Sequence, residues 1–402
     1  MRILQINAVS GIRSTGRICV EIADYLNDNG AEGYIAYSEG IPYEKGYKIG
    51  TALEKRLHAL FSRVFGLQAH FSRFGTKHLL KYIDNLKPDV VHLHNLHSNY
   101  INLKLLANYL AKNDIPTVIT LHDCWFYTGK CTHYTVDNCY KWKTCCKDCP
   151  RLRNDNPSWF FDCTKKMYND KRKILNEIRR LAIVGVSDWI TNEAKKSYFT
   201  SDKIITNIYN WIDSNVFQPI NVDDIKYKLK LKSKFIIVGV ASEWSNAKGL
   251  DKFIELSKML QDDMTIVLVG NININTKLPD NILNIKETHN VEELISYYSM
   301  ANVLINMSFE ESFGKVSAEA LACGTPIIVF DSTANPELVG DGCGYVVEKN
   351  DMTGIRNAIF EVHKNGKENY SKKCIEFANT RFNKNERINN YVELYQKLLD
   401  NS

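Results

Sequence analysis

Residues 306–326 read NMSFEESFGKVSAEALACGTP, and this stretch decides the fold. The apolar residues just before it predict a short buried strand, and a polar turn follows, leading into a helix from about Lys315. The helix is expected to end at Gly324, because glycine adopts a left-handed cap conformation at little cost. The Thr-Pro that follows stops the helix, and residues 327–330 predict the next strand. The loop and the helix N-terminus should therefore lie at the carboxyl edge of a parallel sheet.

Two glutamates in this stretch, Glu311 and Glu319, stand eight residues apart with Gly314 between them. A helix N-terminus presents free backbone N–H groups that suit a phosphate. Carboxylates repel phosphate, but they accept hydrogen bonds from hydroxyls, so the pattern favours a ligand that carries both groups, as a nucleotide sugar does. The alternative is an amphipathic helix with two surface glutamates, which explains most chance matches to this spacing.

Expected strands alternate with helices along the chain, which predicts an α/β protein with parallel, doubly wound sheets. The first series of expected strands covers residues 2–8, 33–37, 90–93, 117–121, 183–186 and 204–209. A polar stretch, residues 214–234, is interpreted as a linker. The second series covers residues 235–241, 265–269, 282–286, 303–306, 327–330 and 345–347. Two series predict two Rossmann-like domains that face each other across a cleft.

The stretch around the two glutamates resembles the glutamate-pair motif of retaining family-4 (group 1) glycosyltransferases with the GT-B fold. The resemblance implies that Glu311 contacts the donor sugar and that Glu319 contacts the ribose hydroxyls. It also implies that backbone at the helix N-terminus approaches the sugar and the diphosphate, at Gly314, Lys315 and Val316.

The same resemblance implies a division of the chain into three parts. Residues 1–212 would form the N-terminal, acceptor-side domain, with a cysteine-rich insert at 124–163. Residues 213–380 would form the domain that binds the nucleotide-sugar donor. The last part, residues 381–402, would be a helix that returns to the first domain.

Lys248 follows the expected strand 235–241 through a short loop and is placed to reach a diphosphate. Family members usually have an arginine a few residues before this lysine, and the loop here has none. One phosphate charge is thereby left unassigned, and either Lys315 or Arg13 is a candidate to supply it. Thr288 stands where the family's base-contacting backbone lies.

His122 ends the expected strand 117–121, and the sequence Thr-Leu-His-Asp around it matches a place where the family has a histidine that contacts the donor sugar. An ordinary hydrogen-bonded loop histidine is the alternative. His94 and Asn95 follow the preceding strand and are expected on the acceptor side of the cleft. A metal site on the neighbouring histidines at 92, 94 and 97 is disfavoured, because nothing places a fourth ligand.

Residues 11–18 read GIRSTGRI and almost match the phosphate-binding P-loop. The required lysine is replaced by Arg17 and the Mg²⁺-binding hydroxyl by Ile18, so an ATPase is disfavoured. The favoured interpretation is a flexible loop over the cleft, in which the two arginines meet phosphate; a plain turn into a helix is the alternative. The cleft candidates in this loop are Gly11, Arg13, Gly16 and Arg17.

Six of the eleven cysteines lie between residues 124 and 149. In a reducing compartment, four of them suggest a structural zinc site, while free cysteines or a disulfide are the alternatives. The expected zinc ligands are Cys131, Cys139, Cys146 and Cys149. This region resembles the cysteine-rich insert of one subgroup of family-4 polysaccharide enzymes, although a glycine is more usual at Cys145.

Charge is distributed unevenly, since residues 1–190 carry a net charge of +9 and residues 191–402 a net charge of −4. Residues 54–81 combine basic and large apolar side chains at helical spacing, which predicts a basic amphipathic surface. This surface either docks on an anionic membrane or belongs to a helix pair that covers the sheet. With no signal peptide expected and no membrane-spanning apolar run, we expect a cytoplasmic protein; docking of this surface would make it peripheral on the inner face of the cytoplasmic membrane.

The chain has no Asp-x-Asp motif, which metal-dependent glycosyltransferases use to hold the donor. No cofactor is therefore expected for catalysis. The resemblance implies a hexosyl-transferring enzyme that moves a sugar, with retention, from a nucleotide sugar to a glycan or a polyprenyl-diphosphate-linked acceptor. The setting would be bacterial capsule or exopolysaccharide biosynthesis. A GT-B nucleotide-sugar epimerase is the alternative, and a nucleic-acid-binding protein is disfavoured, because no second C-x-x-C or finger-like His pair is present.

Overall fold

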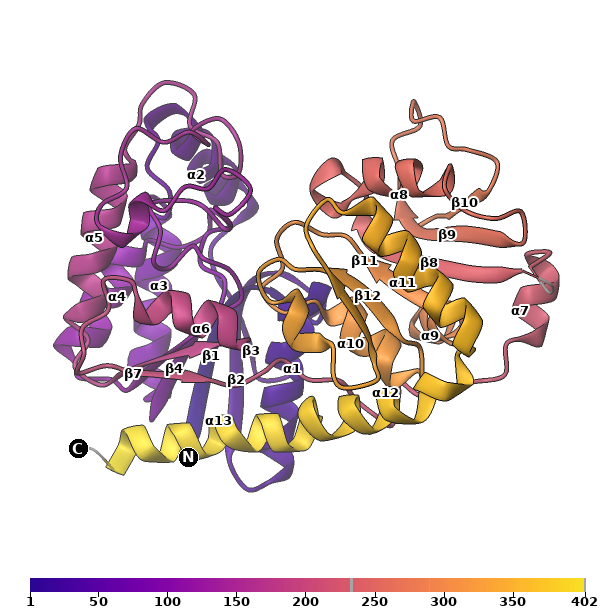
Figure 1. Cartoon of the computed structure of the whole chain (residues 1–402). Helices are drawn as coiled ribbons and strands as arrows, with labels where there is room; N and C mark the ends of the chain where they lie inside the picture. Colours follow the sequence, from indigo (N-terminus) through magenta and orange to yellow (C-terminus); the bar gives the residue numbers. More distant parts are fainter. Residues whose placement is uncertain (232–233, 289, 401–402) are drawn as a thin grey trace. The chain divides into compact units, whose positions relative to one another are not determined.

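The computed structural model describes residues 1–231, 234–288 and 290–400 (Figure 1). The chain forms two compact units. The first unit comprises Met1–Ile208 together with Ile388–Ser402, and the second comprises Tyr209–Arg387. Each unit contains a parallel sheet with helices packed on it, as the alternating pattern predicted.

The first unit contains, within the described residues, a seven-stranded parallel sheet in the order β3-β2-β1-β4-β5-β6-β7. Its strands are β1 Arg2–Ser10, β2 Glu32–Gly40, β3 Gly46–Lys48, β4 Val90–Leu93, β5 Thr117–Leu121, β6 Leu181–Gly185 and β7 Ile204–Asn207. Its helices are α1 Arg13–Asp28, α2 Ala52–Phe65, α3 Arg73–Leu86, α4 Leu103–Lys112, η1 Lys141–Lys143, α5 Thr164–Asn176 and α6 Asp188–Lys195.

The second unit contains, in the part of the chain that is described, a six-stranded parallel sheet in the order β10-β9-β8-β11-β12-β13. Its strands are β8 Phe235–Glu243, β9 Met264–Asn271, β10 Ile282–Ile285, β11 Val303–Asn306, β12 Ile327–Phe330 and β13 Gly344–Val347. Its helices are α7 Asp223–Lys228, η2 Asn246–Lys248, α8 Leu250–Ser257, α9 Val291–Met300, α10 Lys315–Ala322, η3 Asn335–Leu338, α11 Met352–Asn365 and α12 Glu368–Arg381.

The central strands explain both the fold and the position of the candidate sites. β4, β5, β11 and β12 are buried along their whole length, which fits their runs of valine, isoleucine and leucine. Because every pairing in both sheets is parallel, the carboxyl ends of neighbouring strands meet at one edge. In the first unit this edge carries the loops after β1, β4 and β5, and in the second it carries those after β8, β11 and β12.

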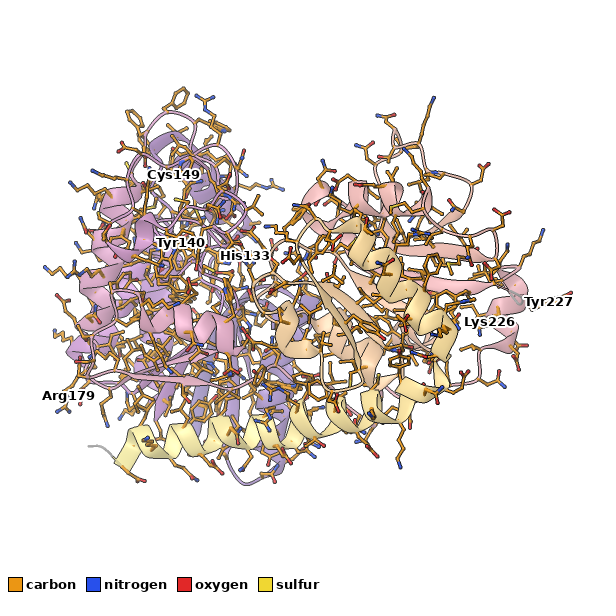
Figure 2. All side chains as sticks on the ribbon, viewed as in Figure 1. His133, Tyr140, Cys149, Arg179, Lys226 and Tyr227 are labelled. Carbon is orange, nitrogen blue, oxygen red and sulfur yellow. The ribbon has the colours of Figure 1, made fainter. Side chains whose placement is uncertain are left out.

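The stretch expected to be a linker, residues 214–234, contains the short helix α7. Two aspartates in its first turn and two lysines in its last turn complement the helix dipole, which favours a helix. Figure 2 shows Lys226 and Tyr227 of α7 at the edge of the second unit, where the Tyr227 side chain is exposed. Residues 232–233 of this stretch lie outside the described residues.

The last helix, α13 (Lys384–Asp400), enters the first unit from Ile388 onward and runs past its sheet (Figure 1). The Tyr395 hydroxyl lies 2.8 Å from Nδ1 of the buried His92 on β4. The Tyr391 hydroxyl lies 3.0 Å from Oγ1 of Thr120 on β5. The end of the chain thus completes the polar core of the first unit.

In the described ranges, no helix is both long enough and apolar enough to cross a lipid bilayer.

Candidate active site

The loop between β11 and α10 in the second unit is held in one conformation by its glycine. Gly314 caps α10 with a φ of +91°, a conformation that other residues rarely adopt. A Cβ at this position would also lie 2.7 Å from Cδ1 of Leu338. No acidic residue lies in the first turn of α10 and no side chain caps it among the described residues, so its N-terminal N–H groups keep a positive potential, near Lys315 and Val316.

Lys248 and Glu311 form an ion pair beside this helix N-terminus. Lys248 Nζ lies 2.6 Å from Glu311 Oε1, with the side chains 40% and 18% exposed, respectively. Lys248 ends η2, and Gly249 after it has a φ of +82°; a Cβ there would also lie 2.8 Å from Cβ of Met307. The tight packing of the two loops therefore brings together a cation and a carboxylate that are 63 residues apart in sequence.

The second glutamate of the pair, Glu319, is buried on α10. Its Oε2 accepts a hydrogen bond from the Tyr298 hydroxyl at 2.7 Å. Burial, and then the nearby carboxylate, raise the pKa of Tyr298 well above its ordinary value, so this phenol stays protonated and donates. Tyr298 was not predicted from the sequence, and its position on α9 among apolar residues gave no signal beyond an ordinary core aromatic.

A network of hydrogen bonds from polar side chains fixes the loop after β11. Asn306 accepts from the backbone N–H of Ser308 at 3.1 Å, and Asn335 donates to the Ser308 carbonyl at 3.2 Å. Thr333 Oγ1 accepts from the backbone N–H of Glu311 at 2.8 Å. Asn335 and Thr333 belong to the loop after β12, so neighbouring loops at one sheet edge hold Glu311 in place.

Thr288 lies in the loop before α9, and its hydroxyl is engaged locally. It donates to a carboxylate oxygen of Glu293 and accepts from the backbone N–H of Asn290 at 3.1 Å. The side chain therefore organises the start of α9. The expected contact with a nucleotide base involves the backbone near Thr288 and stays a prediction.

In the first unit, His94 and His122 meet at the carboxyl edge of the sheet. His94 Nδ1 lies 2.9 Å from His122 Nε2, and His94 Nε2 lies 3.2 Å from Gln5 Oε1. The Gln5 amide nitrogen donates to the Cys19 carbonyl, so its Oε1 must accept from His94. It follows that His94 Nδ1 accepts from His122 Nε2, which leaves Nδ1 of a neutral His122 as a hydrogen-bond acceptor.

Burial keeps these imidazoles uncharged. It lowers the pKa of His122 to about 4 and that of His94 well below its ordinary value. The pKa of His97, which lies in the loop after β4, shifts in the other direction. Burial lowers its pKa, but the carboxylate of Asp123, 2.8 Å away, outweighs this effect and raises it. His92 uses both ring nitrogens on Tyr395 and Thr120, which leaves neither for a metal ion.

The loop after β1 is a short turn. The backbone N–H of Gly11 donates to the Gly16 carbonyl at 3.1 Å, at the start of α1. Arg13 is exposed and Arg17 is half-buried, and within the described residues neither guanidinium has a hydrogen bond or an ion pair. Asn95 donates its backbone N–H to Asn7 Oδ1 at 3.2 Å, which places it next to this turn. Both arginines are therefore available to an anion.

The four cysteines expected to bind zinc lie near one another in the insert, since Cys139 and Cys149 both affect the pKa of Cys146 and Cys131 affects that of Cys149. Among the residues that the structure describes, no three histidine, cysteine, aspartate or glutamate side chains form a group that could hold a metal ion. The Cys131 thiol instead hydrogen-bonds to Cys149, which lowers the Cys149 pKa, and Cys146 accepts from the backbone N–H of Gly129 at 3.1 Å. Figure 2 shows Cys149 in the insert. Zinc binding by these four cysteines stays a prediction, which elemental analysis tests.

Comparison with known proteins identifies the class. The family model for glycosyltransferase family 4 matches residues 15–216, and the model for group 1 glycosyl transferases matches residues 221–381. The chain belongs to the glycosyltransferases of family 4, with a group 1 domain as its second unit.

Curated relatives agree with this membership. A protein of Escherichia coli named as a colanic acid biosynthesis glycosyl transferase, WcaC, is 26% identical over 66% of this chain and 65% of its own length. The N-acetyl-alpha-D-glucosaminyl L-malate synthase of Bacillus anthracis is 25% identical over 54% of this chain and 60% of its own length. The chain thus spans slightly less than two thirds of these relatives.

Solved structures show the same fold over the full chain. Sucrose-phosphate synthase from Thermosynechococcus elongatus matches with a TM-score of 0.71 and 16% identity, covering 100% of this chain and 99% of that one. HepE from Anabaena, in complex with UDP, matches with a TM-score of 0.70 and 16% identity, covering 99% of this chain and 100% of that one. The predicted GT-B fold is confirmed.

Proposed function

We propose that the chain is a retaining, metal-independent glycosyltransferase that moves a sugar from a nucleoside diphosphate sugar to a glycan acceptor. The observation that supports this most is the Lys248–Glu311 pair beside the uncapped N-terminus of α10. An ammonium and a helix N-terminus together suit a diphosphate, and a carboxylate suits sugar hydroxyls. Solved structures of the similar protein HepE contain UDP, and UDP-glucose, which favours a donor of this kind.

In the proposed reaction, the donor's diphosphate replaces Glu311 as the partner of Lys248. Glu311 then accepts hydrogen bonds from the sugar. The bond between the anomeric carbon and the diphosphate oxygen breaks, and its electron pair leaves with the diphosphate. The acceptor oxygen bonds to the anomeric carbon on the same face, and its proton passes to the departing diphosphate. Lys248 and the N–H groups of α10 stabilise the negative charge that develops on the leaving group.

His122 is proposed to orient the donor sugar. Its neutral imidazole has an Nδ1 acceptor, because Nε2 donates into the chain through His94 to Gln5. A sugar hydroxyl can donate to that nitrogen. A neutral ring at this position accepts the hydroxyl without adding a charge beside the anomeric carbon.

The acceptor is proposed to be a lipid-linked glycan of bacterial cell-surface polysaccharide assembly, such as capsule or exopolysaccharide. The name of the relative WcaC refers to colanic acid biosynthesis, and that of a Salmonella relative, RfbU, to O-antigen chains. The first 190 residues carry a net charge of +9, which favours an anionic partner.

A surface of the first unit supports a lipid-linked setting. We define the apolar surface as the exposed large apolar side chains of α2, of α3 and of the insert loop: Leu53, Leu57, Leu60, Phe61, Phe65, Phe74, Trp159, Phe160 and Phe161. The insert loop lies against α2, because the backbone N–H of Trp159 donates to the Arg63 carbonyl at 2.7 Å. Phe74 is 76% exposed and Phe160 is 70% exposed, which is unusual for isolated surface residues.

Basic residues surround this surface on the same helices: Lys55, Arg56, Arg63, Arg73, Lys77 and Lys81. Aromatic groups flanked by cations are the composition of a surface that binds the interface of an anionic bilayer. We therefore propose peripheral docking at the cytoplasmic membrane. Co-sedimentation with phosphatidylglycerol vesicles at low salt should occur for the wild type and be weaker for Phe160→Ser; equal binding by both would contradict this docking.

The transferase proposal is tested by the release of free nucleoside diphosphate. Thermal shift against UDP-, GDP- and ADP-sugars first identifies the donor, because a ligand that binds only the folded chain raises its melting temperature. Release is then measured with and without membrane lipid extract as a source of acceptor. A transferase releases the diphosphate only with an acceptor, whereas release or donor isomerisation without an acceptor would favour the epimerase alternative.

A further inference from the structure

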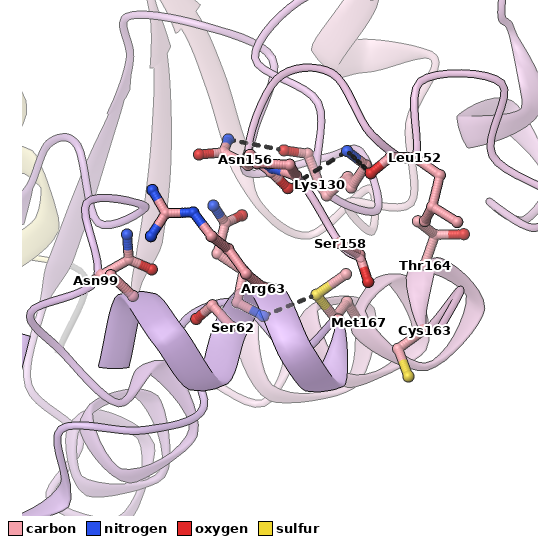
Figure 3. A pocket seen from close by; sticks show the side chains of 14 residues that line it. Ser62, Arg63, Asn99, Lys130, Leu152, Asn156, Ser158, Cys163, Thr164 and Met167 are labelled. Atoms are coloured by element: carbon pink, nitrogen blue, oxygen red, sulfur yellow. Dashed lines mark hydrogen bonds between the residues drawn. The ribbon is translucent and has the colours of Figure 1, made fainter. Parts of the chain in front are cut away.

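A cavity of about 90 Å³ lies in the first unit between the end of α2 and the insert (Figure 3). A single water molecule needs roughly 10–15 Å³ on this measure, so the cavity holds several waters or one group of the size of a phosphate. The cationic residues that line it are Arg63 and Lys130, and none of its lining residues is acidic.

Lys130 brings a buried positive charge to one wall of the cavity. Its Nζ donates to backbone carbonyls of the insert, at 2.7 Å from Arg151, 2.8 Å from Asn154 and 2.7 Å from Asp155. Within the described residues no carboxylate forms an ion pair with it. Carbonyl dipoles solvate the ammonium but carry no net charge, so the wall keeps a positive potential.

Arg63 provides the second cation, and its guanidinium has neither a hydrogen bond nor an ion pair within the ranges described. Figure 3 shows the side chain rising from α2 into the cavity, with Asn99 to one side. Asn99 Oδ1 is buried without a hydrogen-bond partner. The neighbouring Gln68 accepts from Trp125 Nε1 at 2.6 Å and donates one of its two amide N–H groups to the His97 carbonyl. The groups available to a ligand are therefore the Arg63 guanidinium, the Asn99 Oδ1 and the second amide N–H of Gln68.

We propose that this cavity binds the terminal phosphate of an anionic lipid. The fork of a guanidinium matches two phosphate oxygens, and Asn99 Oδ1 can accept a hydrogen bond from the protonated oxygen of a phosphate monoester. The C-terminal carbonyls of a helix would repel an anion, but here they are already occupied. The Ser62 carbonyl accepts from the N–H of Gly66 at 2.9 Å, and that of Arg63 accepts from Trp159.

The rim of the cavity favours a lipid over free phosphate. Gly66 and Ser158 line the cavity. Phe65, just before Gly66, and Trp159, just after Ser158, are exposed aromatic residues of the apolar surface. A ligand with its phosphate on Arg63 would therefore place an attached apolar chain against these rings. This inference deepens the proposed docking, because a terminal phosphate is also the group that a phosphorylated lipid carrier presents.

The test measures binding of the full-length protein to phosphatidylcholine vesicles that contain either phosphatidic acid, which has a terminal phosphate, or phosphatidylglycerol, which has none. Wild type and Arg63→Gln are compared with Arg153→Gln, an exposed arginine of the insert that does not line the cavity. We expect Arg63→Gln to weaken binding to phosphatidic acid about tenfold and to remove the preference over phosphatidylglycerol, while Arg153→Gln keeps that preference. Equal loss in both variants, or no preference in the wild type, would overturn the proposal.

Titration with inorganic phosphate and glycerol 3-phosphate distinguishes the source of the phosphate. Binding of these soluble probes as tight as that of phosphatidic acid would overturn the lipid assignment. A second variant, Asn99→Ala, should weaken phosphatidic acid binding in the same direction. Thermal unfolding and binding of the donor nucleotide should be unchanged in Arg63→Gln, which separates this site from the donor site. An absence of sugar transfer by the wild type would contradict the proposed function and would leave these vesicle measurements as they stand.

Discussion

Lys248 and Glu311 are the two side chains on which the proposed chemistry depends most. Replacing Lys248 by alanine or Glu311 by glutamine should lower the turnover number for transfer by about 100-fold, because each change removes a charge positioned for the diphosphate or the sugar. Both groups are partly exposed, so the loss of their ion pair should change the free energy of unfolding by less than about 1 kcal/mol. Turnover assays and chemical denaturation measure the two effects.

Lys258→Ala is the matched control, because this lysine ends the neighbouring α8 and is exposed. Its turnover should stay at the wild-type value. If Lys248→Ala and Glu311→Gln also kept wild-type turnover, the assignment of the site would be wrong.

Gly314→Ala tests whether the loop conformation matters. A left-handed backbone costs an alanine roughly 1–3 kcal/mol, and its Cβ would in addition lie 2.7 Å from Leu338. Gly30→Ala is the control, since Gly30 has a φ of +76° with open space around the missing Cβ. Thermal unfolding should show the larger loss for Gly314→Ala, which alone should also weaken donor binding. Equal losses would argue against steric fixation of the loop.

Single residues could be predicted from the sequence where local pattern determines them. A helix was expected from about Lys315 to a left-handed Gly324; α10 begins at Lys315, and Gly324 has a φ of +74°. The approach of Lys248 to Glu311 depended on a resemblance, since no local rule joins positions so far apart. The burial of Glu319 against Tyr298 could not be predicted, because the contact joins α9 to α10 and depends on the angle at which these helices pack.

The carboxyl edge of the first sheet should make that unit sensitive to acid. His122 is expected to have an ordinary pKa, about 6.5, when unfolded, and burial lowers its folded pKa to about 4. Between these values the unfolded chain binds more protons than the folded one, so stability falls as the pH falls. His122 should account for a loss on the order of 2 kcal/mol between pH 7 and pH 4, measured by urea denaturation.

His122→Gln is the variant that isolates this effect. It should make stability less dependent on pH over that interval. His97 acts in the opposite direction, because its pKa is raised in the folded state. Its contribution to stability is fully present below the unfolded pKa and is lost as the pH rises through the folded pKa. The variant keeps His97 in place. An unchanged pH dependence in His122→Gln would show that the histidine is not held neutral by the fold.

Elements with strong apolar runs were predictable, and irregular ones were not. The strands that contain runs of valine, isoleucine and leucine were predicted in their order along the chain. The short edge strand β3 was missed, because its Gly-Tyr-Lys is partly exposed and has no apolar run. The insert was expected to be organised by cysteines. In the structure, Lys130 also organises the insert, because it donates to distant backbone carbonyls. One of them, the carbonyl of Arg151, is 21 residues away in the sequence. Such contacts leave no periodic trace in a sequence.

At the scale of the whole molecule, α13 packs against the first unit, so its contacts contribute to the stability of that unit. Tyr395→Phe would leave the buried Nδ1 of His92 without its partner, which should cost about 1–3 kcal/mol in the free energy of unfolding. Gln396→Ala, an exposed neighbour on the same helix, should cost less than about 0.5 kcal/mol. Urea denaturation followed by fluorescence checks both, and equal effects would mean that α13 contributes little to the first unit.

The proposed chemistry depends above all on where a nucleotide sugar binds. A crystal structure of the full chain with the donor found in the thermal-shift screen would answer this. It should show diphosphate oxygens about 3 Å from the N–H groups of Lys315 and Val316 and from Lys248 Nζ, with sugar hydroxyls on Glu311. A donor bound elsewhere, while Glu311 still paired with Lys248, would contradict the proposed donor site.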